Sequence, residues 1–125
     1  MSGDGYPVAR PRRLRRTPAL RRLVAETSLR AGDLVLPVFI KEGISGPQPI
    51  SSMPGVVQHT RDSLRKAAAE AAGAGVGGLI VFGIPAVKDG RGSAADDPAG
   101  ISQLALADLR AEIGDACVIM ADQCM

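Results

Sequence analysis

The residues best placed to do chemistry lie in the segment VIMADQCM, residues 118–125. Apolar residues there lead into Asp122 and Cys124, a carboxylate and a thiol two positions apart. Because strand side chains alternate between faces, both groups would share one face of a strand with Met120. The carboxyl end of a parallel strand is where α/β proteins place ligand sites. One thiol is a weak metal signal, because zinc sites use three or four nitrogen and sulfur ligands, so functional and structural roles remain equally open.

Two lysines and the single histidine are weaker candidates. Lys41 follows the first apolar segment, where a desolvated lysine could form a Schiff base with a carbonyl substrate. Because Glu42 follows it in a polar loop, a solvated, ion-paired lysine is favoured, and Lys88 has a similar standing. His59 lies next to a predicted helix start, so a loop or capping role is favoured over catalysis.

A glycine pattern, GAGVGG, invites comparison with a dinucleotide-binding loop at Gly73, Gly75 and Gly78. That fingerprint requires a strand before it and a helix after it, so that the pyrophosphate meets a helix N-terminus. Here the order is reversed, because a predicted helix precedes the glycines and a predicted strand follows. The pattern therefore indicates a helix C-terminus and a tight turn.

Composition limits the protein class. A chain of 125 residues is the size of one small domain, and 46% hydrophobic with 22% charged residues is ordinary for a soluble protein. Two cysteines, Cys117 and Cys124, are too few for a disulfide scaffold, and no secretory leader or membrane-length apolar run is evident. We expect a cytoplasmic location with free thiols.

The charge is distributed unevenly. Residues 1–30 carry eight arginines against Asp4 and Glu26, a net charge of +6, whereas the remaining residues have a net charge of −4. Thr17 and Pro18 predict a helix start, and a short helix to about Thr27 would have an apolar side. Packing against a protein partner is favoured over nucleic-acid binding, because the apolar stripe needs a partner and no aromatic residues interleave the arginines. We therefore expect no nucleic-acid or membrane partner.

Strand and helix patterns alternate along the rest of the chain. The predicted elements are a strand at 34–40, a helix from Thr60 to about Ala72, a strand at 78–83, a helix opened by Asp97-Pro98 and capped by Gly114, and a strand at 117–124. Such alternation predicts parallel strands joined by right-handed helical crossovers. A doubly wound open sheet and the opening of a (β/α)₈ barrel both fit. Three strands would be an incomplete domain in either architecture.

Six ordered segments carry a family resemblance. They are RLRRTPALRRLVAET, LVLPVFIKEG, ISSMPGV, GLIVFGIP, KDGRGSAA and VIMADQC. In order and spacing they resemble the front part of the porphobilinogen synthase (5-aminolevulinate dehydratase) family, from about Arg10 to Cys124.

The resemblance implies an α/β fold of the TIM (β/α)₈ barrel family. Residues 33–125 would form about the first three β/α units, and residues 1–32 an N-terminal helical arm. In that family the arm wraps a neighbouring subunit of an octamer-like homo-oligomer. The implied activity is that of a lyase, which condenses two 5-aminolevulinate molecules into porphobilinogen for heme and other tetrapyrroles.

The same resemblance assigns two site residues. Asp122 matches the family aspartate beside the substrate pocket, and Cys124 matches the first cysteine of the catalytic metal cluster, which implies zinc, magnesium or both as cofactors. The family's Schiff-base lysines belong to later strands, so we expect none in this chain and no catalytic residue before Met125. We therefore expect a truncated portion that is inactive alone. The alternative is a non-catalytic fragment that docks onto full-length subunits.

Overall fold

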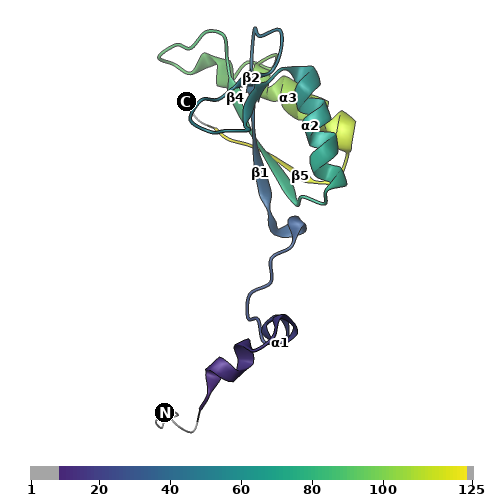
Figure 1. Cartoon of the computed structure of the whole chain (residues 1–125). Coiled ribbons are helices and arrows are strands. Elements are labelled where there is room, and N and C mark those ends of the chain that lie inside the picture. The colour runs from purple at the N-terminus through teal and green to yellow at the C-terminus, as the bar shows by residue number, and fades with distance from the viewer. Residues whose placement is uncertain (1–8, 124–125) are drawn as a thin grey trace.

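The structure is a computed structural model that describes residues 9–123. Figure 1 shows an α/β unit with a long N-terminal extension. The strands are β1 (Val35–Lys41), β2 (Gln48–Pro49), β3 (Val57–His59), β4 (Gly78–Ile84) and β5 (Val118–Ala121). The α-helices are α1 (Pro18–Leu23), α2 (Arg61–Gly73) and α3 (Ile101–Ile113), and the 3₁₀ helices are η1 (Pro11–Arg15), η2 (Ala31–Asp33) and η3 (Ser93–Ala95). Within residues 9–123, no helix has the length and apolar character to cross a membrane.

The strands form one sheet in the order β2-β3-β1-β4-β5. Strand β1 pairs in parallel with β4, and β4 pairs in parallel with β5, as the alternating pattern predicts. Strand β1 also pairs in parallel with β3. The sequence analysis missed β2 and β3, of which β2 runs antiparallel to β3. Both are only two or three residues long and lie in or just after a Gly/Pro-rich segment, so they have no periodic pattern to detect.

Helix α2 begins where the sequence predicts. The Thr60 hydroxyl accepts a hydrogen bond from the Ser63 amide at 3.1 Å, while the Ser63 hydroxyl accepts one from the Thr60 amide at 3.0 Å. This reciprocal capping box satisfies two helix-terminal N–H groups. The helix ends at Gly73, one residue beyond the predicted end.

The predicted start of α3 at Asp97-Pro98 was wrong. The helix begins at Ile101 with Gly100 as its N-cap. Asp97 instead closes a turn before the helix, because its side chain accepts from the Ala99 amide and its carbonyl from the Gly100 amide. The predicted C-terminal glycine is confirmed, since Gly114 follows the helix with φ of +54°.

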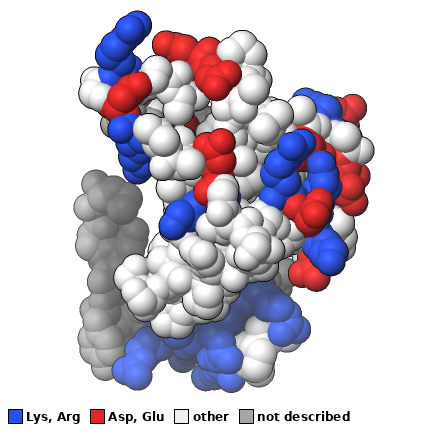
Figure 2. Space-filling model, turned by 90° about the horizontal axis from the view of Figure 1, so that it is seen from above, with Lys and Arg blue, Asp and Glu red and all other residues white. Residues whose placement is uncertain are grey.

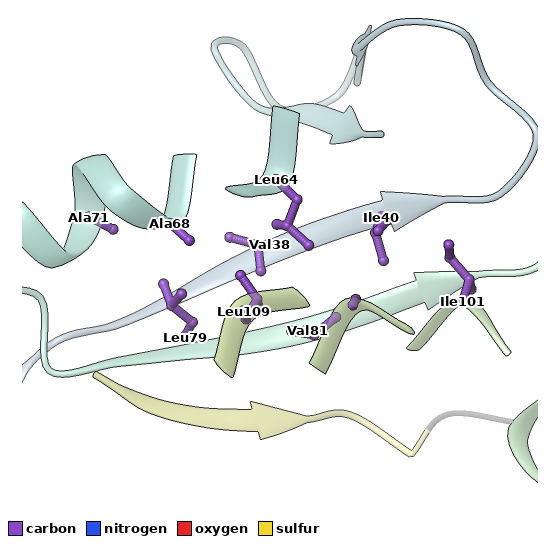
Figure 3. Close-up of a cluster of buried hydrophobic side chains, with 10 residues drawn as sticks. Val38, Ile40, Leu64, Ala68, Ala71, Leu79, Val81, Ile101 and Leu109 are labelled. Atoms are coloured by element: carbon purple, nitrogen blue, oxygen red, sulfur yellow. The ribbon is translucent and has the colours of Figure 1, made fainter. Parts of the chain in front are cut away.

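A single apolar core lies between the sheet and the helices α2 and α3 (Figure 3). Its buried side chains are Val38, Ile40, Leu64, Ala68, Ala71, Leu79, Val81, Ile101, Ala105 and Leu109. Strand β1 contributes Val38 and Ile40, and β4 contributes Leu79 and Val81, which are alternate residues of each strand. Both helices contribute residues three or four positions apart. Both helices therefore cover the same face of the sheet (Figure 1).

Residues 9–30, here named the arm, are built differently from residues 35–121, here named the body. No arm residue is buried, and only Leu20 is half-buried. Figure 1 shows the arm extending away from the body. Helix α1 ends at Leu23 instead of the predicted Thr27, because its six residues lack the tertiary contacts that lengthen marginal helices.

Candidate functional site

The sheet face opposite the helices, here named the open face, carries regular rows of side chains. Register places Val35, Gly78 and Val118 in one row across β1, β4 and β5, and Pro37, Ile80 and Met120 in the next. Phe39 and Phe82 form a third row nearer the carboxyl edge. Because Val118 is 63% exposed and no helix within residues 9–123 covers this side, the open face presents apolar surface up to the strand ends.

The third row is aromatic. The rings of Phe39 and Phe82 stack with centroids 5.1 Å apart, and both side chains are half-buried. Stacked aromatic pairs stabilise a surface beyond the area they bury. The aromatic pair thus forms a firm apolar floor just below the carboxyl edge of the sheet.

Asp122 lies beside this floor. It follows the last residue of β5, is half-buried, and donates its backbone amide to the Val81 carbonyl at 2.9 Å. Met120 lies over Gly78 on the open face, since a Cβ built on Gly78 would meet the Met120 methyl at 3.0 Å. The alternation of β5, continued one position past its last residue, would place Asp122 on the open face. Strand β5 itself ends at Ala121, three residues before the predicted end, so Asp122 lies just beyond the strand.

Cys124 lies outside the described residues. Within residues 9–123, no group of three or more His, Cys, Asp or Glu side chains is arranged to hold a metal ion. A tetrahedral zinc site needs three or four ligands, so the described residues do not supply such a site by themselves. The other cysteine, Cys117, is buried and donates its thiol to the Val76 carbonyl, a structural arrangement.

Lys41 lies at the carboxyl end of β1, as predicted, but the expected pairing with Glu42 was wrong. Glu42 instead accepts a hydrogen bond from the Ala86 amide at 3.0 Å, which ties the loop after β1 to the loop after β4. Lys41 is half-buried and forms no ion pair with any described residue. Lys88 lies exposed in the loop after β4.

His59 has the capping role that the sequence favours. Its Nδ1 lies 2.9 Å from the hydroxyl of Ser63, the residue that closes the capping box of α2. Partial burial lowers the pKa of the imidazole below its ordinary value, because burial disfavours the charged form. The ring is therefore part of the start of α2.

The sequence analysis missed an ion-pair network between the two helices. Asp108 of α3 is only 8% exposed and accepts from Arg61 at 2.7 and 2.8 Å and from Arg65 at 2.8 Å. The Arg61 hydrogen bonds, together with Arg65, hold the pKa of Asp108 below its ordinary value despite burial. In the sequence, the position of Asp108 beside the apolar residues of α3 could have indicated a buried charge. Its arginine partners on α2 could be found only from the tertiary structure.

The glycines of GAGVGG form the predicted turn. Gly73 ends α2, Gly75 adopts φ of +83°, and Gly78 begins β4. The positive φ is a conformation that glycine adopts without the strain a side chain would bring. The dinucleotide-binding interpretation is therefore excluded on geometry.

Comparisons with known proteins identify the family of the chain. The family model of delta-aminolevulinic acid dehydratase matches residues 8–125. Among curated relatives, the delta-aminolevulinic acid dehydratase of Mycobacterium tuberculosis is 61% identical over 127 aligned positions, covering 100% of this chain and 39% of that protein. The Streptomyces coelicolor enzyme is 58% identical over 122 positions, covering 96% of this chain and 37% of that protein.

A solved structure has the same fold. The delta-aminolevulinic acid dehydratase (porphobilinogen synthase) of Toxoplasma gondii, solved with the product porphobilinogen, superposes with a TM-score of 0.83 at 29% identity. The match covers 91% of this chain and 32% of that one. The chain thus spans well under half the length of the relatives it matches. On the sequence match and the shared parallel α/β sheet together, the chain belongs to the delta-aminolevulinic acid dehydratase family.

Proposed function

We propose that this chain supplies about the first three β/α units of a porphobilinogen synthase barrel, formed by residues 33–125, and that residues 1–32, which include the arm, contact a neighbouring subunit. The whole enzyme would condense two molecules of 5-aminolevulinate into porphobilinogen. One observation carries the proposal: the open face has barrel-type rows of side chains that lead to Asp122 at the carboxyl edge. That edge is where barrel enzymes have their active sites.

Asp122 is proposed as a substrate-pocket residue. The amino group of 5-aminolevulinate is a cation, and a half-buried carboxylate beside an apolar floor would accept a charge-assisted hydrogen bond from it. The stacked rings of Phe39 and Phe82 would exclude water from one side of this contact, which strengthens it. Asp122 would thereby orient the substrate amine.

Cys124 is proposed as one metal ligand, with zinc favoured by its thiolate and magnesium as the other cation the family resemblance implies. Since residues 9–123 hold no complete donor set, further ligands would come from the rest of the enzyme. A bound zinc ion would act as a Lewis acid on substrate.

The arm is proposed as a homo-oligomer contact. It carries eight arginines and exposed apolar side chains, whereas the body has the opposite net charge. Viewed from above, basic side chains dominate the distant arm and both signs mix over the body (Figure 2). A second copy in an octamer-like assembly would offer both an acidic and an apolar surface. We further propose a cytoplasmic location for this biosynthetic enzyme.

We also propose that the 125-residue chain is inactive alone, because the family's Schiff-base lysines match none of its residues. The test mixes it with a polypeptide carrying the part of the Mycobacterium tuberculosis relative beyond the matched region. Neither component alone should form porphobilinogen from 5-aminolevulinate and zinc, whereas the mixture should.

Asp122→Asn in the mixture should lower the rate about 100-fold or more, since an oriented carboxylate would be lost. Asp115→Asn is the matched control, because Asp115 is an exposed aspartate of the same body and should leave the rate unchanged. The proposal fails if the two polypeptides do not associate, if their complex makes no product, or if Asp122→Asn retains full activity. Association without product would favour the alternative of a non-catalytic interaction fragment.

A further inference from the structure

A chemically reactive dipeptide lies in the loop between β4 and α3. Asp89 is followed there by Gly90, and both residues are exposed. The chain has two aspartates followed by glycine, Asp4 and Asp89, and Asp4 lies outside the described residues. Asp89-Gly90 is therefore the Asp-Gly pair of the body, and the proposed function assigns it no role.

The reaction open to an Asp-Gly pair is an isomerisation of the backbone. The amide nitrogen of the glycine attacks the side-chain carboxyl carbon of the aspartate, a C–N bond forms, and the carboxyl hydroxyl leaves with the amide proton as water. Water then opens the resulting succinimide. When it breaks the bond between the nitrogen and the original backbone carbonyl carbon, the chain continues through the side-chain carbon as isoaspartate. Glycine favours this reaction because it has no side chain to hinder the ring closure.

The carboxylate of Asp89 is held by three donors. Its Oδ1 accepts hydrogen bonds from the Arg91 amide at 3.1 Å and the Ser93 amide at 3.0 Å, and its Oδ2 accepts one from the Ser93 hydroxyl. The Asp89 carbonyl accepts a further bond from the Gly92 amide at 3.2 Å, which closes a turn around Gly90. The residues that follow the pair thus fix both its carboxylate and its backbone.

These bonds oppose the isomerisation in two ways. The reaction needs a neutral carboxyl group, because a carboxylate has no hydroxyl to release, and the Ser93 hydroxyl, together with the Ser93 and Arg91 amides, holds the pKa of Asp89 below its ordinary value. The carboxyl carbon also becomes tetrahedral during the attack, so its oxygens must leave the positions in which the three donors bind them.

We propose that Asp89-Gly90 is the isoaspartate-forming site of the body, and that the Ser93 hydroxyl controls the rate by keeping the Asp89 carboxylate bound and unreactive. Of the three donors, the hydroxyl is the one that a side-chain substitution removes, since the other two are backbone amides. Isomerisation would insert a methylene group into the backbone and separate the carboxylate from these donors. It would thereby loosen the loop that joins the carboxyl end of β4 to the start of α3.

The experiment ages the full chain at constant pH and temperature in water labelled with heavy oxygen. Each succinimide that opens takes up a labelled oxygen, so peptide mapping by mass spectrometry locates the reaction among all the aspartates. Ser93→Ala should isomerise at Asp89 about fivefold faster than the unsubstituted chain, because a hydrogen bond to a charged group is lost. Ser93→Thr keeps the hydroxyl and should stay close to the unsubstituted rate.

A second substitution tests which nitrogen attacks. Gly90→Ala, combined with Ser93→Ala, should bring the rate back at least to that of the unsubstituted chain, because a methyl group hinders the ring closure. The position accepts alanine, since a side chain built on Gly90 would meet no atom within 4 Å beyond its chain neighbours and its φ lies outside the left-handed region. Ser51→Ala is the matched control, because it removes an exposed hydroxyl outside the loop and should leave the rate unchanged.

Equal rates at Asp89 in the unsubstituted chain and in Ser93→Ala would overturn the role of the hydroxyl. Label that collects first at another aspartate of the body, or a Gly90→Ala variant that isomerises as fast as its parent, would overturn the site. Should circular dichroism show that Ser93→Ala folds poorly, Ser93→Cys takes its place, since a thiol is a weak donor. Because catalysis does not enter this test, its failure would leave the proposed function standing.

Discussion

Different interactions determine the structures of the body and the arm. The body buries ten apolar side chains between a parallel sheet and two helices, and its helix α3 contacts α2, β1, β4 and β5. The arm buries none, and its helix α1 makes contacts mainly with the neighbouring η1. The structure of the body is therefore specified by long-range burial, whereas that of the arm depends on local hydrogen bonds.

This difference bears on where each region gains stability. A six-residue helix is too short to be stable in water on its own, so α1 needs an external surface to become well populated. Its exposed Leu23 and its arginines are the groups such a surface would contact. The arm is accordingly the region in which mutations should leave the stability of the isolated chain unchanged.

The largest expected effect is on the free energy of unfolding, and it compares a buried leucine of the body with an exposed leucine of the arm. Leu109 of α3 is fully buried, and Leu109→Ala should lower the free energy of unfolding by about 3 kcal/mol, through lost transfer free energy and a residual cavity. Leu23→Ala, at a position 81% exposed in the arm, should change it by less than about 0.5 kcal/mol. Urea unfolding followed by circular dichroism measures both. Equal losses of unfolding free energy in the two variants would contradict the distinction between a buried body and an exposed arm.

A smaller effect is expected for the ion-pair network within the body. Asp108→Asn removes charge-assisted hydrogen bonds between α2 and α3 and should cost about 2 kcal/mol. Asp115→Asn, in an exposed pair with Arg110, is the control and should cost no more than about 0.5 kcal/mol. Because Arg61 and Arg65 lower the pKa of Asp108 below 3.8, the network's contribution is present above that pH and is lost as the pH falls further. The same loss from both variants would refute a special role for Asp108.

The pH dependence of the body should include His59. Its pKa lies below the ordinary 6.5 because of burial, so the unfolded chain binds a proton more readily over the interval between the two values. Stability should therefore fall as the pH drops below about 6.5, and His59→Gln should remove that part of the decrease. Thermal midpoints from pH 7.5 to 5 test this. An unchanged pH profile in the variant would show that His59 is not the group responsible.

The smallest effect on global stability is expected from the helix cap in the arm. The Thr17 hydroxyl accepts from the Leu20 amide at 3.0 Å, and Thr17→Ala should reduce the population of α1 by removing that bond. The free energy of unfolding of the body should not change. Carbon chemical shifts of residues 18–23 report the helix, and urea unfolding reports the body. A cooperative loss of body stability would show that the arm is part of the folding unit.

Local signals and periodicity account for what the sequence predicted correctly. The Thr60 capping residue, Gly114 and the buried strands at 34–40 and 78–83 are confirmed, because short-range chemistry or full burial defines them. The alternation that placed Asp122 beside Met120 is consistent with the register of β5 with β4. The assignment of Cys124 as a metal ligand stays a prediction.

The features that were missed depend on tertiary contacts. The Glu42 carboxylate bonds to Ala86, 44 positions away, and Arg61 bonds to Asp108, 47 positions away. No periodic pattern in the sequence identifies hydrogen-bond partners that lie so far apart along the chain. The strands β2 and β3 exist only through pairing with each other and with β1, and their few residues have no amphipathic pattern. The end of α1 and the start of α3 also depended on what surrounds them.

Hydrogen exchange of the isolated chain, resolved by residue, tests the contrast between body and arm most directly. The account predicts strong protection of amides in β1, β4, α2 and α3, which surround the core, and exchange close to unstructured rates for amides 18–23 of α1. Protection in α1 equal to that in α3 would contradict it, because it would show that the arm is stabilised together with the body's core.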